Sequence, residues 1–314
     1  MKCPVCNSSS DLELTKDGFD YFRCSRCEFL FHRSEPKKEI PASSSFYNSK
    51  YWAMERQEAL RREREDCFDR ALELLYLSTI PVRNILDFGC GLGLTVKLLR
   101  ESLGLNAIGV DPTGEFEPSE YLHKSGVEEL QQKYPAGYFD AIYSIEVFEH
   151  LEDPRRILTV LNSLLKPGGK ILINTGTQEY IKKYDPESSY IDPAVRGHIS
   201  IYSLKTLSVL GGFLGLKASF LADRKYVALL EAPSERAFPH PDNIQTIRRM
   251  GDWLVPLLTE YMRLVFVEEE FEKKSLWLAQ LLAAQGGSKT RLILAFLRVG
   301  GAWFRRLTTE TRRH

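Results

Sequence analysis

Four cysteines near the start of the chain have the spacing of a metal site. Two C-x2-C pairs are separated by seventeen residues, and their members are Cys3, Cys6, Cys24 and Cys27. Zinc prefers four thiolates in a tetrahedral arrangement, and each C-x2-C turn presents two sulfurs to one ion. The pattern predicts a structural Zn²⁺ in a ribbon over residues 1–35, which is too small to be stable by its core alone. Two disulfides or a redox C-x-x-C pair are the alternatives, with Cys67 and Cys90 left as buried thiols.

A glycine-rich segment, NILDFGCGLGLTVKLL, runs from an apolar strand directly into a helix. Gly89, Gly91 and Gly93 allow a sharp turn and the close approach of a ligand. Asp111 ends the next strand eighteen residues beyond Gly93, where a carboxylate can accept both hydroxyls of a ribose. A dinucleotide fingerprint needs a third glycine at the position of Leu94, so the segment favours a nucleoside-type cofactor without a pyrophosphate.

A second group of polar residues follows the apolar segment 139–145. Glu146, Glu149 and His150 would share one face of a helix, because they are three and four positions apart. Two carboxylates and an imidazole there could ligate a divalent ion, or could supply a general base with an orienting acid. The alternative without chemistry is that Glu149 caps a helix and His150 packs in the core.

Strand and helix patterns alternate from residue 82 onward, and this alternation positions both groups. It predicts a mostly parallel, doubly wound α/β sheet that ends in an antiparallel hairpin over 217–222 and 225–231. Residues 51–77 predict a solvated helix with one buried stripe. The predicted division is a zinc ribbon (1–35), a linker and charged helix (36–80), an α/β domain (81–232) and a C-terminal helical extension (233–314).

Four motifs of the α/β segment resemble, in order and spacing, those of class I S-adenosylmethionine-dependent methyltransferases (type 11/23-like). They are ILDFGCGLG, VDPTGE, FDAIYSIEVFEHLEDP and LKPGGKILINT, and they cover roughly residues 80–232. The resemblance implies a seven-stranded Rossmann-like sheet and S-adenosylmethionine as the cofactor. The cofactor-binding residues that it implies are Asp87, Gly89, Gly91, Gly93, Asp111, Val127 and Ser144.

The E-x-x-E-H pattern resembles magnesium-dependent ubiquinone-pathway O-methyltransferases and the RNA 2′-O-methyltransferases that modify small-RNA ends. In the RNA group a further histidine completes the metal site, and His198 in RGHISIYS is its counterpart here. The resemblance implies catalytic roles for Glu146, Glu149, His150 and His198, with Mg²⁺ or another divalent ion as the ion they would hold.

Charge narrows the choice of methyl acceptor. The net charge is zero and the isoelectric point is near 7, which disfavours a nucleic-acid partner bound through phosphates. We expect O-methylation of a small molecule, a saccharide or a natural-product intermediate. One alternative is an rRNA guanine methyltransferase that uses the ribbon to recognise RNA, and another is a non-catalytic binding or scaffold protein with the same fold.

Neither an export signal nor a membrane-spanning run is evident, so a cytoplasmic protein is expected. Arginines and apolar residues interleave over 288–314. This segment predicts either peripheral membrane contact through an interfacial helix or a helix that docks on the α/β domain or on a second copy. The sequence leaves the oligomeric state open.

Overall fold

The computed structural model describes residues 1–33, 59–179, 181, 190–194, 196–220, 227–232 and 240–247. All of them belong to one compact unit, Met1–Ile247. The second unit, Arg248–His314, lies outside the described residues, and so does the predicted lipid-facing or docking helix over 288–314. Within the described ranges, no helix is both long and apolar enough to cross a membrane.

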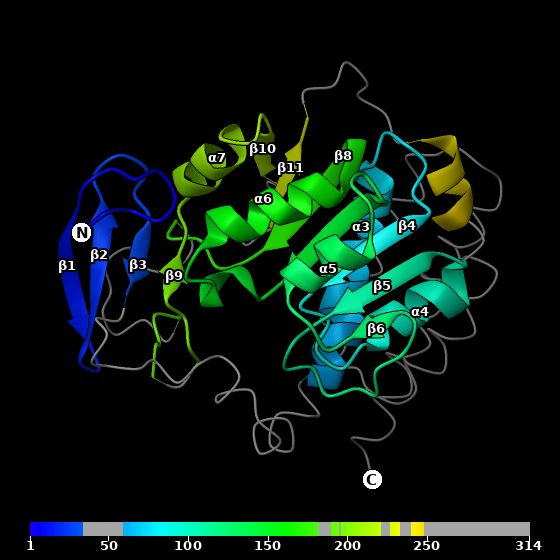
Figure 1. Cartoon of the computed structure of the whole chain (residues 1–314), viewed down its shortest axis with the longest axis horizontal. Coiled ribbons are helices and arrows are strands. Elements are labelled where there is room, and N and C mark those ends of the chain that lie inside the picture. The colour runs from blue at the N-terminus through cyan, green and yellow to red at the C-terminus, as the bar shows by residue number, and fades with distance from the viewer. Residues whose placement is uncertain are drawn as a thin grey trace, which may run out of the picture. The chain divides into compact units, whose positions relative to one another are not determined.

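A seven-stranded sheet with the order β10-β11-β8-β7-β4-β5-β6 forms the centre of this unit (Figure 1). β11 runs antiparallel to both of its neighbours, and the remaining pairs are parallel. This arrangement confirms the predicted Rossmann-like sheet with its reversed final hairpin. The strands are β4 (Asn84–Phe88), β5 (Asn106–Val110), β6 (Leu122–His123), β7 (Phe139–Ile145), β8 (Leu165–Asn174), β10 (Lys217–Phe220) and β11 (Val227–Glu231).

Helices cover the sheet, and this is why its central strands are mostly apolar and buried along nearly their whole length. All seven residues of β7 are buried. α3 contacts α4, β7 and β8, whereas α5 and α6 form a separate contacting pair; Figure 1 shows α6 in front of the sheet and α3 behind it. The helices are α3 (Phe68–Leu77), α4 (Leu94–Leu103), α5 (Val127–Lys133), α6 (Pro154–Leu164) and α7 (Leu204–Gly212).

The charged helix differs from its prediction. It is described from residue 59, and a π-helical turn, η1 (Glu63–Cys67), precedes α3. α3 then buries five successive residues, 71–75, so the prediction of a single buried stripe is wrong. The physical reason is that the sheet and α4 cover two sides of this helix. A π turn adds a residue to the helical repeat and redirects the side chains before it, a feature that is frequent at functional sites.

The ribbon is a second, antiparallel sheet of four strands with the order β1-β2-β3-β9. β1 (Ser10–Lys16), β2 (Phe19–Cys24) and β3 (Leu30–His32) come from the N-terminal segment, as predicted. β9 (Ser200–Ile201) comes from the chain that follows β8, and nothing in the sequence predicted this pairing. Ribbon and α/β fold therefore share one sheet.

Candidate active site and cysteine cluster

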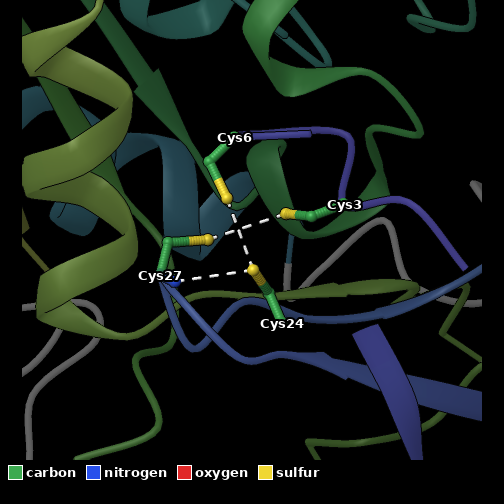
Figure 2. Close-up of side chains that lie close together, drawn as sticks. All are labelled: Cys3, Cys6, Cys24 and Cys27. Atoms are coloured by element: carbon green, nitrogen blue, oxygen red, sulfur yellow. Dashed lines mark hydrogen bonds between the residues drawn. The ribbon is translucent and has the colours of Figure 1, made fainter. Parts of the chain in front are cut away.

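The four predicted metal ligands converge at one end of the ribbon. Figure 2 shows their side chains pointing toward a common centre. The Sγ atoms of Cys3 and Cys27 are 3.6 Å apart, those of Cys6 and Cys24 are 3.3 Å apart, and all four lie within 4.8 Å of one another. Tetrahedral coordination with Zn–S bonds of about 2.3 Å places sulfurs about 3.8 Å apart, so the four thiols fit a zinc ion.

Backbone geometry around the two cysteine pairs repeats itself. Asn7 and Glu28 directly follow the second cysteine of each pair, and their φ angles are 60° and 65°. The Asn7 N–H donates to the carbonyl of Cys3 (2.9 Å), and the Glu28 N–H donates to that of Cys24 (3.1 Å). A four-cysteine metal site requires two matching turns of this kind and four free, buried thiols. Two disulfides would not require matching turns.

The aromatic side chains of the ribbon fill its core. Tyr21, Phe29 and Phe31 are at most 1% exposed. They are therefore not available to stack on nucleic-acid bases.

The glycine loop follows β4 and leads into α4. All three of its glycines have positive φ angles: 89° at Gly89, 55° at Gly91 and 71° at Gly93. Any side chain at Gly89 would also collide with Val147, because its Cβ atom would lie 2.2 Å from a Val147 methyl group. The loop thus needs glycine both for its conformation and for its contact with the segment that follows β7.

Two aspartates lie beside this loop, as predicted. Asp87 is buried within β4 and accepts a hydrogen bond from the hydroxyl of Tyr143 (2.8 Å). Asp111 accepts the backbone N–H of Gly91 (3.1 Å) and that of Thr113 (2.8 Å), so it joins the end of β5 to the glycine loop. Burial raises the pKa of both carboxyls.

The last two predicted cofactor residues occupy structural positions. Val127 starts α5 and is 2% exposed within the main apolar core. Ser144 lies in β7 and donates its hydroxyl to the carbonyl of Phe88 at the end of β4 (2.9 Å). Their roles toward a cofactor stay predictions.

Glu63, which the sequence did not single out, lies against the same loop. Its carboxylate accepts the backbone N–H groups of Leu92, Leu94 (2.6 Å) and Thr95 (3.4 Å) at the start of α4. Its own carbonyl accepts the hydroxyl of Thr95 (2.8 Å). Burial nevertheless raises the pKa of Glu63 to about 7. The chain's own carboxylate thus occupies a helix N-terminus of the kind that binds the pyrophosphate in dinucleotide folds.

The segment after β7 is not the helix that the sequence predicted. Glu146 has a φ angle of 54°, and a single 3₁₀ turn, η2 (Phe148–His150), follows it. Asn174 at the end of β8 accounts for the difference, because it fixes Glu146 twice. Its carbonyl accepts the Glu146 N–H (2.9 Å), and its side-chain amide donates to the Glu146 carboxylate (2.9 Å). A glutamate in the left-handed region is uncommon, and such residues are concentrated at functional sites.

Glu149, His150 and His198 come together from this turn and from the segment before β9. One ligand atom of each lies within 4.8 Å of those of the other two. Glu149 is fully buried, and one of its oxygens accepts the Thr175 hydroxyl (2.7 Å). The other oxygen accepts no N–H or hydroxyl among the described residues, but the Glu149 carboxylate does accept a hydrogen bond from the protonated Glu146 carboxyl, which raises the pKa of Glu146 and lowers that of Glu149. A buried carboxylate is costly unless it is compensated, and either the Glu146 proton or a bound cation would compensate it.

Both histidines are oriented by backbone carbonyls. The Nδ1 atom of His150 lies 3.1 Å from the carbonyl oxygen of Gly197, and that of His198 lies 2.6 Å from the carbonyl oxygen of Tyr190. An Nδ1–H that donates to a carbonyl leaves Nε2 as the metal-binding atom, which is the usual arrangement of metal-ligating histidines. The four predicted catalytic residues are therefore gathered at the strand ends: the possible ligand atoms of three of them lie within 4.8 Å of one another, and Glu146 lies beside them.

Burial sets the charge states in this group. It lowers the pKa of both histidines, that of His198 to about 3, so both imidazoles are neutral at physiological pH. Burial, together with the negative charge of Glu149, raises the pKa of Glu146 to about 8. The positive charge of Arg62, directly before Glu63, lowers the pKa of Glu146 and so opposes this rise. Arg62, which acts on Glu146, is thus a further residue, after Glu63, that the sequence did not single out.

Comparison with known proteins places the chain among methyltransferases. A family model described as a methyltransferase domain matches residues 52–218. The ubiquinone biosynthesis O-methyltransferase of Xanthomonas campestris pv. campestris is 34% identical over 107 residues, which cover 31% of this chain and 44% of that protein. The tRNA U34 carboxymethyltransferase of Alteromonas mediterranea is 30% identical over 118 residues, or 32% of this chain and 34% of that one.

The chain thus matches less than half the length of both relatives. Among solved structures, an S-adenosylmethionine-dependent methyltransferase from Archaeoglobus fulgidus aligns with a TM-score of 0.41 and 22% identity, over 54% of this chain and 75% of that one.

Proposed function

We propose a reaction for this chain from the premise that it belongs to the methyltransferase domain family, whose model matches more than half of its 314 residues. It is a class I S-adenosylmethionine-dependent methyltransferase, and the reaction is transfer of the methyl group to a hydroxyl of a small molecule or saccharide. The observation that carries the proposal is the ligand set of Glu149, His150 and His198 at the strand ends beside the glycine loop.

The glycine loop and its two aspartates would bind the cofactor. When bound, S-adenosylmethionine supplies a methyl group on a positively charged sulfur. The loop at Gly89 and Gly91 lets the backbone approach the cofactor closely, and Asp111 holds the loop at the end of β5, where the ribose would lie. Glu63 keeps the start of α4 in place and occupies the position that a pyrophosphate would need.

The acceptor side would hold a divalent cation. Two neutral imidazoles and a buried carboxylate form a donor set that suits Mg²⁺ poorly and Mn²⁺, Fe²⁺ or Zn²⁺ better, since imidazole prefers the transition metals. The ion would lower the pKa of an acceptor hydroxyl that binds to it. Glu146, beside the ligand set, is then placed to take the hydroxyl proton in its ionised form, and its pKa of about 8 makes this form the majority only above that pH.

A histidine base is the rival account of the same residues. A base with a pKa near 3, as burial gives His198, accepts too few protons near neutral pH to assist deprotonation of a hydroxyl. The cation is therefore favoured over His198 as the activating group.

The four-cysteine cluster would hold a structural zinc ion. All four positions are taken by protein thiols, so no coordination site is left for a substrate, and the zinc would stabilise the ribbon.

Cofactor binding is tested by calorimetry with S-adenosylhomocysteine. We expect micromolar affinity in the wild type and at least a tenfold loss in Asp111→Ala, because the carboxylate holds both the loop and the ribose. Asp11→Ala, which removes an exposed carboxylate from β1, is the control and is expected to bind normally. Absence of binding in the wild type would refute the enzymatic function.

Acceptor chemistry is tested by transfer of a labelled methyl group to panels of phenols, sugars and nucleotide sugars, with tRNA and rRNA fragments as further arms. We expect hydroxyl-bearing small molecules to be labelled with added Mn²⁺, and His198→Ala to lose at least 90% of the rate. His240→Ala, outside the cluster, should retain it. If only RNA is labelled, the acceptor is RNA and the proposed small-molecule acceptor is wrong.

A further inference from the structure

The ribbon is bonded to the very segment that carries His198. The hydroxyl of Tyr21, on β2, donates to the carbonyl of His198 (2.6 Å). The backbone N–H of His32 donates to the carbonyl of Ile199 (2.8 Å). β3 and β9 then continue as a pair, with Leu30 opposite Ile201. Four successive residues, 198–201, thus take their partners from the N-terminal sheet.

The opposite edge of the same segment contacts the turn that carries the other two ligands. The N–H of Ile199 donates to the carbonyl of Glu149 (2.9 Å). The hydroxyl of Ser200 donates to the carbonyl of Leu151 (2.6 Å), and that of Tyr202 donates to the carbonyl of Phe148 (2.8 Å). Figure 1 shows β9 beside β3, on the side of the ribbon that faces the α/β fold. The segment 198–202 is therefore held between the ribbon and η2.

The cysteine cluster itself takes part in this attachment. The carbonyl of Cys27 accepts the hydroxyls of Ser203 (3.3 Å) and Thr206 (2.9 Å), the two residues that cap the start of α7. Phe29, two residues beyond Cys27, packs on Tyr202 with ring centroids 5.0 Å apart. A change in the geometry of this cysteine pair would therefore reach the residues that directly follow β9.

We infer that the cysteine ribbon is a positioning element for the acceptor site: zinc binding at the four cysteines fixes the place of His198 through Tyr21 and β3. The inference rests on the proposed function for the role of His198, and it gives the ribbon a task within this chain rather than toward an external partner. Tyr21 is a positioning residue, because it acts through the His198 backbone and does not touch the ligand atoms.

The deciding experiment is Tyr21→Phe in the full, zinc-loaded chain. Mn²⁺ is the probe, and its binding is followed by the electron paramagnetic resonance signal of the free ion. One buried neutral hydrogen bond contributes about 0.5–1.5 kcal/mol, so we expect the Mn²⁺ affinity to fall about twofold to twelvefold. The affinity for S-adenosylhomocysteine should stay within about twofold. Tyr134→Phe is the matched control, since it removes a hydroxyl whose partner is His123 and not the acceptor site.

A second measurement does not depend on any variant folding correctly. The imidazole resonances of His198 and His240 are compared by NMR between wild-type chains loaded with Zn²⁺ and with the larger Cd²⁺. We expect the His198 resonance to move and that of His240 to stay. If Tyr21→Phe leaves Mn²⁺ affinity unchanged, or if His198 does not respond to the exchange of ion, the inference is overturned.

The two proposals fail in different ways. If the wild type does not bind S-adenosylhomocysteine, the proposed methyltransferase function is refuted. The NMR comparison still shows whether the ion in the ribbon affects His198. Without Mn²⁺ binding in the wild type, the acceptor-side cation fails, and the NMR comparison alone decides whether the ribbon positions His198.

Discussion

Replacement of Glu63 by glutamine gives the sharpest test of the electrostatics beside the glycine loop. Burial favours the protonated carboxyl, whereas the three N–H groups of α4 and its preceding loop favour the carboxylate. The balance raises the pKa of Glu63 from 4.5 to about 7 in the folded protein. Since one pKa unit is equivalent to about 1.4 kcal/mol, the ionised group costs the folded state about 3 kcal/mol.

The sign of the pH dependence follows from proton binding. Between pH 4.5 and about 7 the folded protein holds the Glu63 proton and the unfolded chain has released it. The free energy of unfolding therefore decreases as pH rises through this window, and the loss is complete above pH 7. Glutamine does not titrate. We expect the stability of Glu63→Gln relative to wild type to increase by about 3 kcal/mol between pH 4.5 and 8.

Urea unfolding followed by circular dichroism at pH 4.5, 6, 7 and 8 measures this difference. Glu129→Gln removes the same charge from an exposed position on α5 and serves as the control. A difference that decreases with rising pH would refute the reasoning, because it would mean that the N–H groups outweigh burial and keep Glu63 ionised. A difference that does not vary with pH would show that burial and the N–H groups cancel.

Three further outcomes are expected. Gly89→Ala should lower the free energy of unfolding more than Gly104→Ala in thermal melts, because both glycines have positive φ angles and only the first would meet another side chain, that of Val147; equal losses would contradict this. Asp140→Ala should cost about 1–3 kcal/mol in urea unfolding, since it leaves the N–H groups of Arg83 and Asn84 without their acceptor. Cys24→Ser should remove the bound zinc equivalent seen by elemental analysis, and retention of one zinc per chain would exclude the four-cysteine site.

The parts of the site that could be predicted from sequence are those encoded locally. The loop can be predicted from Gly89, Gly91 and Gly93 because few other residues tolerate positive φ angles. Asp111 can be predicted because it directly follows its own strand. The cysteine pairs are equally local, since each C-x2-C turn is complete within five residues. The order of strands and helices then follows from the apolar pattern, and with it the sheet.

The parts that escaped prediction depend on partners far away in the chain. Glu63 reaches the loop because a π turn begins there, and no helical periodicity anticipates such a turn. Glu146 was placed on a helix, but Asn174, twenty-eight residues later, holds it in the left-handed region.

The attachment of the ribbon through β9 also bears on the order in which the chain folds. The hydrogen bond between Tyr21 and His198 spans 177 positions, so the first three strands leave the ribosome long before their fourth partner exists. At about 5–20 residues per second, the edge of β3 stays unpaired for on the order of ten seconds or more. An open edge strand invites association with other chains. Early metal capture by the cysteines would hold the short ribbon in one conformation through that interval, until β9 is synthesised and completes the sheet.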